Sequence, residues 1–372
     1  MEEIKLENYQ AIAIASIVML SHIILNLPNH LIAQTGSATI LNFIYVFGIV
    51  LVICYFVTKF FKLFPSSDLI DICEYTSGKI AKNIYAISLI IYLITVSAFV
   101  IRIFAESLVN IYFPNMNVSI IVLIFVSVTS IMNILGFKAI SRATIILFPV
   151  IIVAFIFVFI SSSSSFVPER ALPILGYGFS ETFLTGFTNI FSFSSALVIT
   201  MIAPYISDGK RLRKVSFCSL IIYGLSLLGG IITMLFSIST VNNIHGTLAV
   251  YVLAKRVTIG TFIQSIDALF ILVWIMLIFI YLAVILHFLL TSFNKVMPIK
   301  HKKLMIFIFS TITFIISIMP KDTFYLDFFE STIYRYVSII FVFFISFAIL
   351  ILGYIKKKHE LKKGVSKLEK TY

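Results

Sequence analysis

Long apolar runs separated by short polar segments make up most of this chain. A helix needs about 20 apolar residues to cross the roughly 30 Å hydrocarbon core of a bilayer. Ten runs reach or approach that length, at about 9–32, 38–61, 84–109, 118–136, 142–161, 182–206, 215–239, 262–290, 304–320 and 333–355. The pattern therefore predicts ten membrane-spanning helices.

The runs are continuous, whereas strands of a membrane β-barrel alternate apolar and polar residues over about ten positions. Helices and closed barrels are the structures that satisfy their backbone hydrogen bonds inside lipid. We therefore expect an all-α polytopic membrane protein. The first run follows Met1-Glu2-Glu3 without a basic segment or a small-residue cleavage site. It is expected to be a retained span and not a signal peptide.

Composition supports this fold class and excludes others. Residues of the set AVILMFWYC make up 60% of the 372 residues, and charged residues only 12%. A soluble domain has roughly 45–50% apolar residues, so a soluble, a disordered or a nucleic-acid-binding protein is excluded. Cys54, Cys73 and Cys218 lie far apart without paired spacing. They indicate neither a disulfide framework nor a metal site, and no cofactor is expected.

The basic residues predict the orientation of the spans, because Lys and Arg gather on the cytoplasmic side. With the N-terminus inside, 22 of the 28 Lys and Arg residues fall on inner segments. These are Lys5, Lys59, Lys62, Lys79, Lys82, Lys138, Arg142, Lys210, Arg211, Arg213, Lys214, Lys295, Lys300, Lys302, Lys303 and the seven lysines from Lys356 to Lys370. Outer segments hold Arg170, Lys255, Arg256, Lys321 and Arg335. Both termini are therefore predicted to be cytoplasmic.

The chain is expected to form one transmembrane domain, residues 1–372, made of two halves. A serine-rich and proline-containing outer segment divides it into 1–165 and 166–355, and a basic tail, 356–372, follows. Five spans in each half give the halves opposite orientations, which is the form of an inverted repeat. In such folds the first helix of each half is broken near the bilayer midplane, where ligands bind.

The first span carries a candidate break. Pro28 removes a backbone donor and clashes with the carbonyl of Ile24, four residues earlier. Ser21 and Asn26 could satisfy the freed groups or face a ligand, and His22 could titrate near neutral pH. The alternatives are an ordinary proline kink and a buried histidine that is satisfied by a carbonyl.

The corresponding sixth span carries the second candidate break. Ser192, Ser194 and Ser195 lie within five residues, and Pro204 closes the span. Small hydroxylated side chains permit close backbone approach and local unwinding. Breaks at matching positions of two halves predict a ligand site between interrupted helices 1 and 6.

Charged groups inside a membrane are costly and point to function. Arg102 and Glu106 lie four residues apart in the third span and share one helix face. Arg102 could bind a carboxylate, and Glu106 or Asp267 of the eighth span could bind an amine or relay protons. The alternative is a structural Arg102–Glu106 pair, with Asp267 near the headgroups.

Short motifs along the chain resemble those of the spore germination permeases, the B subunits of GerA-type germinant receptors. They are Met19-Leu20, Leu25-x-Leu27-Pro28, Arg102-x-x-Ala105-Glu106, Leu172-Pro173-x-Leu175-Gly176-x-Gly178, Asp267 with Val273-Trp274-Ile275, and Pro320-x-Asp322. The family is similar to amino acid–polyamine–organocation transporters with a LeuT-like fold. The resemblance covers nearly the whole chain.

The resemblance implies a nutrient-sensing subunit of the spore inner membrane, working with an A subunit and a lipoprotein C subunit. It implies that a small nutrient, such as an amino acid, binds between spans one, three, six and eight. Where the family has Gly-x-Gly in span one, this chain has Ser21-His22-Ile23, and Ile23 lacks the backbone access of glycine.

The second function considered is a proton-coupled amino acid transporter, using Glu106, Asp267 or His22. An enzyme is not indicated, because the sequence has no HExxH zinc motif, no phosphate-binding GxxxxGK[ST] loop and no GxGxxG turn.

Overall fold

A computed structural model describes residues 5–24, 27–206, 208–237, 267–320 and 323–369. The first half contains α1 (Asn8–Ile24), α2 (Leu27–Thr35), η1 (Gly36–Ala38), α3 (Thr39–Phe61), α4 (Leu69–Tyr112), α5 (Val118–Leu135) and α6 (Phe137–Ser162). The connection between the halves contains the short 3-10 helices η2 (Ser163–Ser165) and η3 (Pro168–Ala171). Every regular element in the described part of the chain is helical.

The second half begins with η4 (Ser180–Leu184), η5 (Thr185–Ala196), α7 (Leu197–Ile202) and η6 (Ala203–Tyr205), followed by α8 (Gly209–Ser237). After the gap come α10 (Asp267–Val296), α11 (Lys302–Ile318), α12 (Thr323–Phe328), η8 (Phe329–Tyr334), α13 (Arg335–Ser338), η9 (Ile339–Ile345) and α14 (Ser346–Glu369). The helices from α12 to α14 are contiguous along the chain, and we call them together helix 10. We call the stretch from η4 to η6 helix 6.

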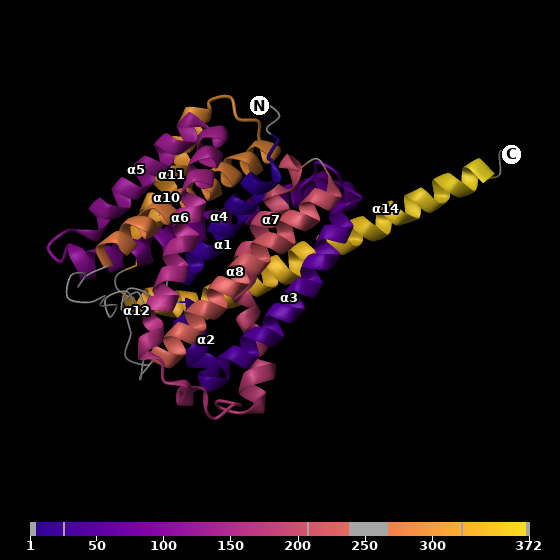
Figure 1. Ribbon diagram of the computed structural model, residues 1–372. Helices are drawn as coiled ribbons and strands as arrows, with labels where there is room; N and C mark the ends of the chain where they lie inside the picture. The colour runs from indigo at the N-terminus through magenta and orange to yellow at the C-terminus, as the bar shows by residue number, and fades with distance from the viewer. Residues whose placement is uncertain (1–4, 25–26, 207, 238–266, 321–322, 370–372) are drawn as a thin grey trace.

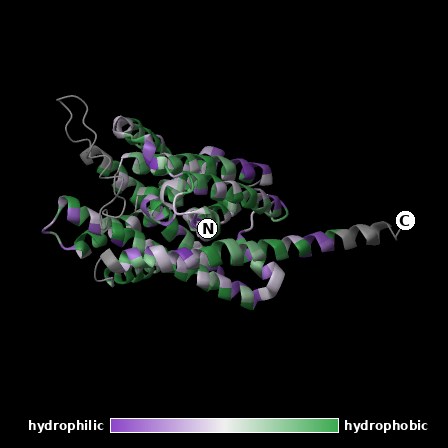
Figure 2. Ribbon diagram, turned by 90° about the horizontal axis from the view of Figure 1, so that it is seen from below, coloured by the Kyte–Doolittle hydropathy of each residue, from purple (hydrophilic) through white to green (hydrophobic). Residues whose placement is uncertain are grey.

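The bundle is built around α1 and α10, which are the most enclosed apolar helices. α1 packs against α6, α8 and α10, and α10 packs against α4, α5 and α6. Figure 1 shows these helices at the centre, with α3 and α8 side by side and the far end of α14 projecting from the bundle. Figure 2 shows hydrophobic residues along the bundle and a more hydrophilic end of α14.

The outer faces of the bundle carry large exposed hydrophobic side chains, for example Ile146 at 69% and Phe344 at 64% exposure. Lipid is the solvent in which such faces are stable. By length and composition, eight helices of the described residues can cross a membrane. The chain is therefore a multi-pass membrane protein, and the number of ten spans stays a prediction.

The helix that contains the expected third span is longer than expected. α4 has 44 residues and passes through Gly78, whose backbone has φ 84°. The segment before Gly78 begins with a capping box between Asp68 and Asp71, in which each side chain accepts from the other's backbone N–H. Because the backbone of Gly78 is not helical, α4 consists of two helical segments that meet at a kink, and the second segment, residues 79–112, contains the expected span. The first segment therefore lies outside the span expected at 84–109.

Candidate functional site

The expected first break falls on residues 25 and 26, which lie outside the described residues. α1 ends at Ile24 and α2 begins at Leu27. Pro28 is the second residue of α2, in the first turn, where the missing N–H of proline costs no hydrogen bond. Pro28 thus starts the second helix segment. Asn26 lies outside the described residues.

Helix 6 is irregular in a different way from the expected local unwinding. It begins with the π-helical turn η4, continues as the 3-10 helix η5, and becomes α-helical only at α7. Ser192, Ser194 and Ser195 lie in a tightened 3-10 helix, which corrects the expectation that they unwind. Pro204 lies in η6 and closes helix 6, as predicted.

Changes of helix type leave backbone carbonyls without regular partners, and a side chain of the first half binds two of them. The Nδ2 of Asn42 on α3 donates to the carbonyls of Thr182 at 2.7 Å and Gly186 at 3.0 Å. Its Oδ1 accepts from Asn189 Nδ2 at 2.8 Å. Asn42 is buried and ties helix 6 to α3.

A central cavity of about 30 Å³ lies between five helices, enough for a few water molecules. Its lining comes from α1, α4, helix 6, α10 and helix 10, and consists of Val18, His22, Tyr92, Leu93, Val96, Ser194, Ser195, Leu197, Val198, Met201, Tyr281, Ile285 and Tyr334. A neighbouring cavity of about 20 Å³ shares His22, Val96 and Tyr334 and adds the carboxylate of Glu330. Both central cavities therefore contact His22, near the described end of α1.

The polar groups around the central cavity hold one another in place. The His22 ring stacks on Tyr334, with centroids 6.1 Å apart, and meets Tyr281 edge-on at 5.6 Å. The Tyr334 hydroxyl lies 2.8 Å from Ser194 Oγ. Ser195 Oγ is shielded from solvent and has no hydrogen-bond partner among the described residues. A buried hydroxyl usually has a partner, so Ser195 offers a free hydroxyl to a ligand.

Other expected site residues lie elsewhere. Ser21 and Ser192 bind carbonyls of their own helices, Val18 O at 2.8 Å and Asn189 O at 2.7 Å. Ile24 ends α1 and Asp267 begins α10, with side chains outside the described part of the chain.

Arg102 and Glu106 form an ion pair with each other. Arg102 Nε lies 3.0 Å from Glu106 Oε2, and both side chains are largely buried. Neither residue lines the two central cavities. This is the geometry of the structural pair given as the alternative.

A polar cluster at the end of α2 was not among the site residues predicted from the sequence. His30 Nε2 lies 3.3 Å from Glu330 Oε2. Arg335 of α13 donates to Gln34 Oε1 and lies 4.7 Å above the Phe191 ring, while Gln34 Nε2 donates to Thr185 O and Thr188 Oγ1 at 2.9 Å each. α2, helix 6 and helix 10 are therefore joined on this side of the cavity. Glu330 escaped notice because the tenth span was expected to start only at residue 333.

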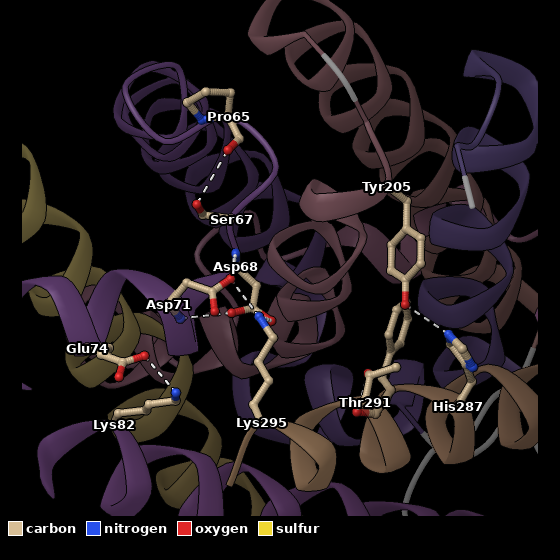
Figure 3. Close-up of polar contacts among 11 residues, drawn as sticks. Pro65, Ser67, Asp68, Asp71, Glu74, Lys82, Tyr205, His287, Thr291 and Lys295 are labelled. Atoms are coloured by element: carbon tan, nitrogen blue, oxygen red, sulfur yellow. Dashed lines mark hydrogen bonds and ion pairs between the residues drawn. The ribbon is translucent and has the colours of Figure 1, made fainter. Parts of the chain in front are cut away.

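The opposite end of the bundle is joined as well. Leu6 N–H donates to Tyr205 O at 3.0 Å, and the Tyr205 hydroxyl lies 2.9 Å from His287 Nε2. Figure 3 shows Lys295 of α10 reaching both Asp68, at 2.7 Å, and Asp71, at 2.6 Å. The helices are thus joined to one another at both ends of the bundle.

Burial raises the pKa of Asp68, and the Lys295 ammonium works against that rise. Two carboxylates share this one ammonium, so the site keeps an excess of negative charge.

The described residues contain no group of three or more His, Cys, Asp or Glu side chains placed to hold a metal ion. Among the described residues that line the two central cavities, none is a lysine or an arginine. The arrangement is suited to hold a small polar molecule through hydroxyl, imidazole and carboxylate groups.

Comparison with known proteins agrees with this geometry. The sequence model of the spore germination protein family matches residues 5–325. No curated protein matches the chain. Among solved structures, a Na⁺-coupled sialic acid symporter in a substrate-bound outward-open state has a TM-score of 0.64 at 11% identity, covering 94% of this chain and 78% of that one. The inward-facing conformation of Mhp1 has a TM-score of 0.57 at 10% identity, covering 89% and 73%. These similarities confirm the predicted LeuT-like fold.

Proposed function

Because the chain belongs to the spore germination protein family, we propose that it is the membrane subunit of a germinant receptor. In this proposal a small nutrient such as an amino acid binds in the central cavity. The signal then passes to an A subunit and a lipoprotein C subunit in the spore inner membrane, with both termini on the core side. The family and fold are those of permeases, so the protein is permease-like and not enzyme-like.

The observation that carries the proposal is the central cavity near the described end of α1. It is lined by the helices expected from the sequence and by helix 10, and it contains the unpartnered hydroxyl of Ser195. Its volume of about 30 Å³ is smaller than an amino acid needs, so binding requires the surrounding helices to move apart. A ligand that binds the opened arrangement more tightly shifts the protein toward it.

Ser195→Ala tests this site with little risk to folding, because the hydroxyl that it removes has no hydrogen-bond partner in the part of the chain that the structure describes. We expect the variant to keep its thermal midpoint and to bind an active nutrient about five- to tenfold more weakly, the value of one lost hydrogen bond. The measurement is a thermal-shift screen of the purified full chain against amino acids, sugars and nucleosides. Ser216→Ala on α8 removes a buried hydroxyl that lines neither central cavity and is the control.

A proton-coupled transporter is the second candidate, and Glu330 is the observation that favours it. This carboxylate is buried, pairs with His30 and lines a cavity together with His22. If the protein is a transporter, a proton gradient should drive concentrative uptake of the nutrient into proteoliposomes. The Glu330→Gln variant should lose this uptake. The receptor function predicts nutrient binding without accumulation, so uptake by the wild type would decide for the transporter.

A further inference from the structure

A second cavity lies apart from the central pair and is larger, at about 60 Å³. We call it the lateral cavity. Its walls come from α3, helix 6, α8 and helix 10, and consist of Val50, Ile53, Cys54, Val57, Ala196, Leu197, Ile199, Thr200, Leu220, Val342, Phe343, Ser346, Phe347 and Leu350. None of the functions proposed above uses it.

The described lining of the lateral cavity presents hydrocarbon to an occupant. Thr200 Oγ1 donates to Leu197 O at 2.7 Å, and Ser346 Oγ donates to Phe341 O at 2.9 Å. The hydroxyls are thus already satisfied, and the Cys54 thiol behaves as a small apolar group. An occupant therefore gains free energy by burying hydrocarbon and not by forming hydrogen bonds.

The side chains that flank the lateral cavity face the lipid. Val52 and Tyr55 on α3 are 57% and 42% exposed, and Phe344 in η9 is 64% exposed. Each is within two residues of a lining residue. The cavity thus lies next to the acyl chains of the bilayer, which supply an occupant of the right chemistry.

A cation marks the polar end of the lateral cavity. The Arg213 guanidinium lies 4.9 Å above the ring centroid of Tyr55, the residue after Cys54. Arg213 precedes the lining residue Leu220 by seven positions on α8, which is roughly 10 Å along the helix. That rise is comparable to the distance between a lipid phosphate and the upper part of its acyl chains.

Other basic side chains surround Arg213. The start of α8 touches the end of α3, since a Cβ placed on Gly209 would lie 3.1 Å from Lys62 Cγ. Lys59, Lys62 and Lys214 are all exposed there. This group favours an anionic over a zwitterionic headgroup.

We propose that the lateral cavity is a binding site for an anionic phospholipid, with one acyl chain between α3 and helix 10 and the phosphate at Arg213. The site is separate from the nutrient site, and its test does not depend on any nutrient.

The test is native mass spectrometry of the delipidated full chain, with phosphatidylglycerol and phosphatidylcholine of the same chain length added in turn. We expect one tightly retained phosphatidylglycerol per protein. Cys54→Trp fills the cavity and should lower its affinity at least about tenfold, because the methylene groups of the chain lose their buried surface. Val52→Trp places the same ring on the lipid-facing side of α3 and should change the affinity less than about twofold.

The headgroup is tested separately. Arg213→Gln should reduce the preference for phosphatidylglycerol over phosphatidylcholine about fivefold, the effect of one basic side chain at an anionic surface. Lys300→Gln removes an exposed charge on the connection between α10 and α11 and should leave the preference unchanged. Inorganic phosphate at millimolar concentration should not displace the lipid. Displacement would identify a free-phosphate site and overturn the proposal.

A measurement on the unmodified protein guards against misfolding of Cys54→Trp. Phosphatidylglycerol should slow alkylation of Cys54 by a small membrane-permeant maleimide, while labelling of Cys218 on α8 proceeds at its original rate. Equal labelling of Cys54 with and without the lipid would refute occupancy of the cavity, whatever the variants show.

Discussion

Tyr334 and Ser194 connect helix 10 to helix 6 across the central cavity. Their hydroxyls lie 2.8 Å apart, and both residues are buried. A hydrogen bond of this kind contributes about 0.5–1.5 kcal/mol to stability. It also fixes Tyr334 against the His22 ring, so Tyr334 contacts both another helix of the second half and α1 of the first half at the candidate ligand site.

A double-mutant cycle measures this connection. Tyr334→Phe and Ser194→Ala should each lower the free energy of unfolding by about 1–2 kcal/mol, because each leaves the other hydroxyl buried without its partner. The double variant should be less destabilised than the sum, with a coupling energy of about 0.5–1.5 kcal/mol. Thermal or denaturant unfolding in detergent provides the values, and strictly additive losses would show that the two hydroxyls do not interact.

Asp68 gives a prediction for pH. Because burial raises its pKa above that of the unfolded chain, the stability that it contributes is present at low pH and is lost as the pH rises through the raised value. Asp68→Asn keeps a residue suited to cap α4 and leaves Asp71 paired with Lys295. We expect its thermal midpoint to exceed that of the wild type by a few degrees at pH 8, and the difference to shrink on acidification.

Lys295→Met is the contrasting variant. It leaves two neighbouring carboxylates without their ammonium, so its midpoint should fall at pH 8 and recover in part at low pH. Identical pH profiles for wild type and Asp68→Asn would show that Asp68 titrates normally.

Several site residues were predictable because their neighbours in sequence mark them. His22 lies six residues before Pro28, Ser194 and Ser195 lie within a serine cluster, and all three line the central cavity. Tyr281 and Tyr334 have no such signal, because an aromatic residue in an apolar span reads as packing. Glu330 required only a correct start of the tenth helix, since an acid inside a span is a candidate by default.

At the scale of elements, helix 6 depends on a side chain from another helix. Helix 6 changes from π to 3-10 to α turns between η4 and α7. Among the described side chains, Asn42 is the one that donates hydrogen bonds to the backbone carbonyls of Thr182 and Gly186. Sequence predicted an irregular helix here from its serines. The type of irregularity was not predictable, because it depends on the position of α3.

Asn42→Leu should therefore affect both folding and ligand binding. The loss of two hydrogen bonds to buried carbonyls is expected to cost about 2–4 kcal/mol of stability. Asn133→Leu is a matched control, because Asn133 is equally buried and donates to Thr129 O of its own helix and to Ala283 O of α10. Both variants should lose stability, whereas only Asn42→Leu should weaken nutrient binding; equal effects on binding would remove helix 6 from the site.

The contact between the end of α2 and the loop that contains Gly176 explains why this position is a glycine. Gly176 has φ 51°, and a Cβ there would lie 2.1 Å from Thr35 O. The loop between the halves can therefore touch the end of α2 only with glycine at this position. Gly176 of this motif thus has a packing role at the end of α2.

For the whole molecule, the apolar pattern predicted the helices well and their ends less well. The runs at 38–61 and 118–136 correspond closely to α3 and α5. α14 extends far beyond its expected span, because charged residues such as Lys358 end a membrane crossing without ending a helix. The LeuT-like fold followed from the order of motifs, whereas the central cavity depends on contacts between distant segments.

The orientation of the whole chain in the membrane stays a prediction from its basic residues. In a chain without its native cysteines, Lys300→Cys and Lys358→Cys should resist a membrane-impermeant maleimide applied to intact cells. Arg170→Cys, on the connection between the halves, should be labelled. Labelling of the first two positions before cell lysis would reverse the assigned topology.

One side chain, Leu197, lines both the central and the lateral cavity. When the Leu197 side chain moves into one of the two cavities, it enlarges the other. If both proposed occupants bind, their free energies are linked, and thermodynamics requires the linkage to be mutual. The anionic lipid content of the membrane would then change the affinity of the protein for its nutrient, and the nutrient would change the affinity for the lipid by the same factor.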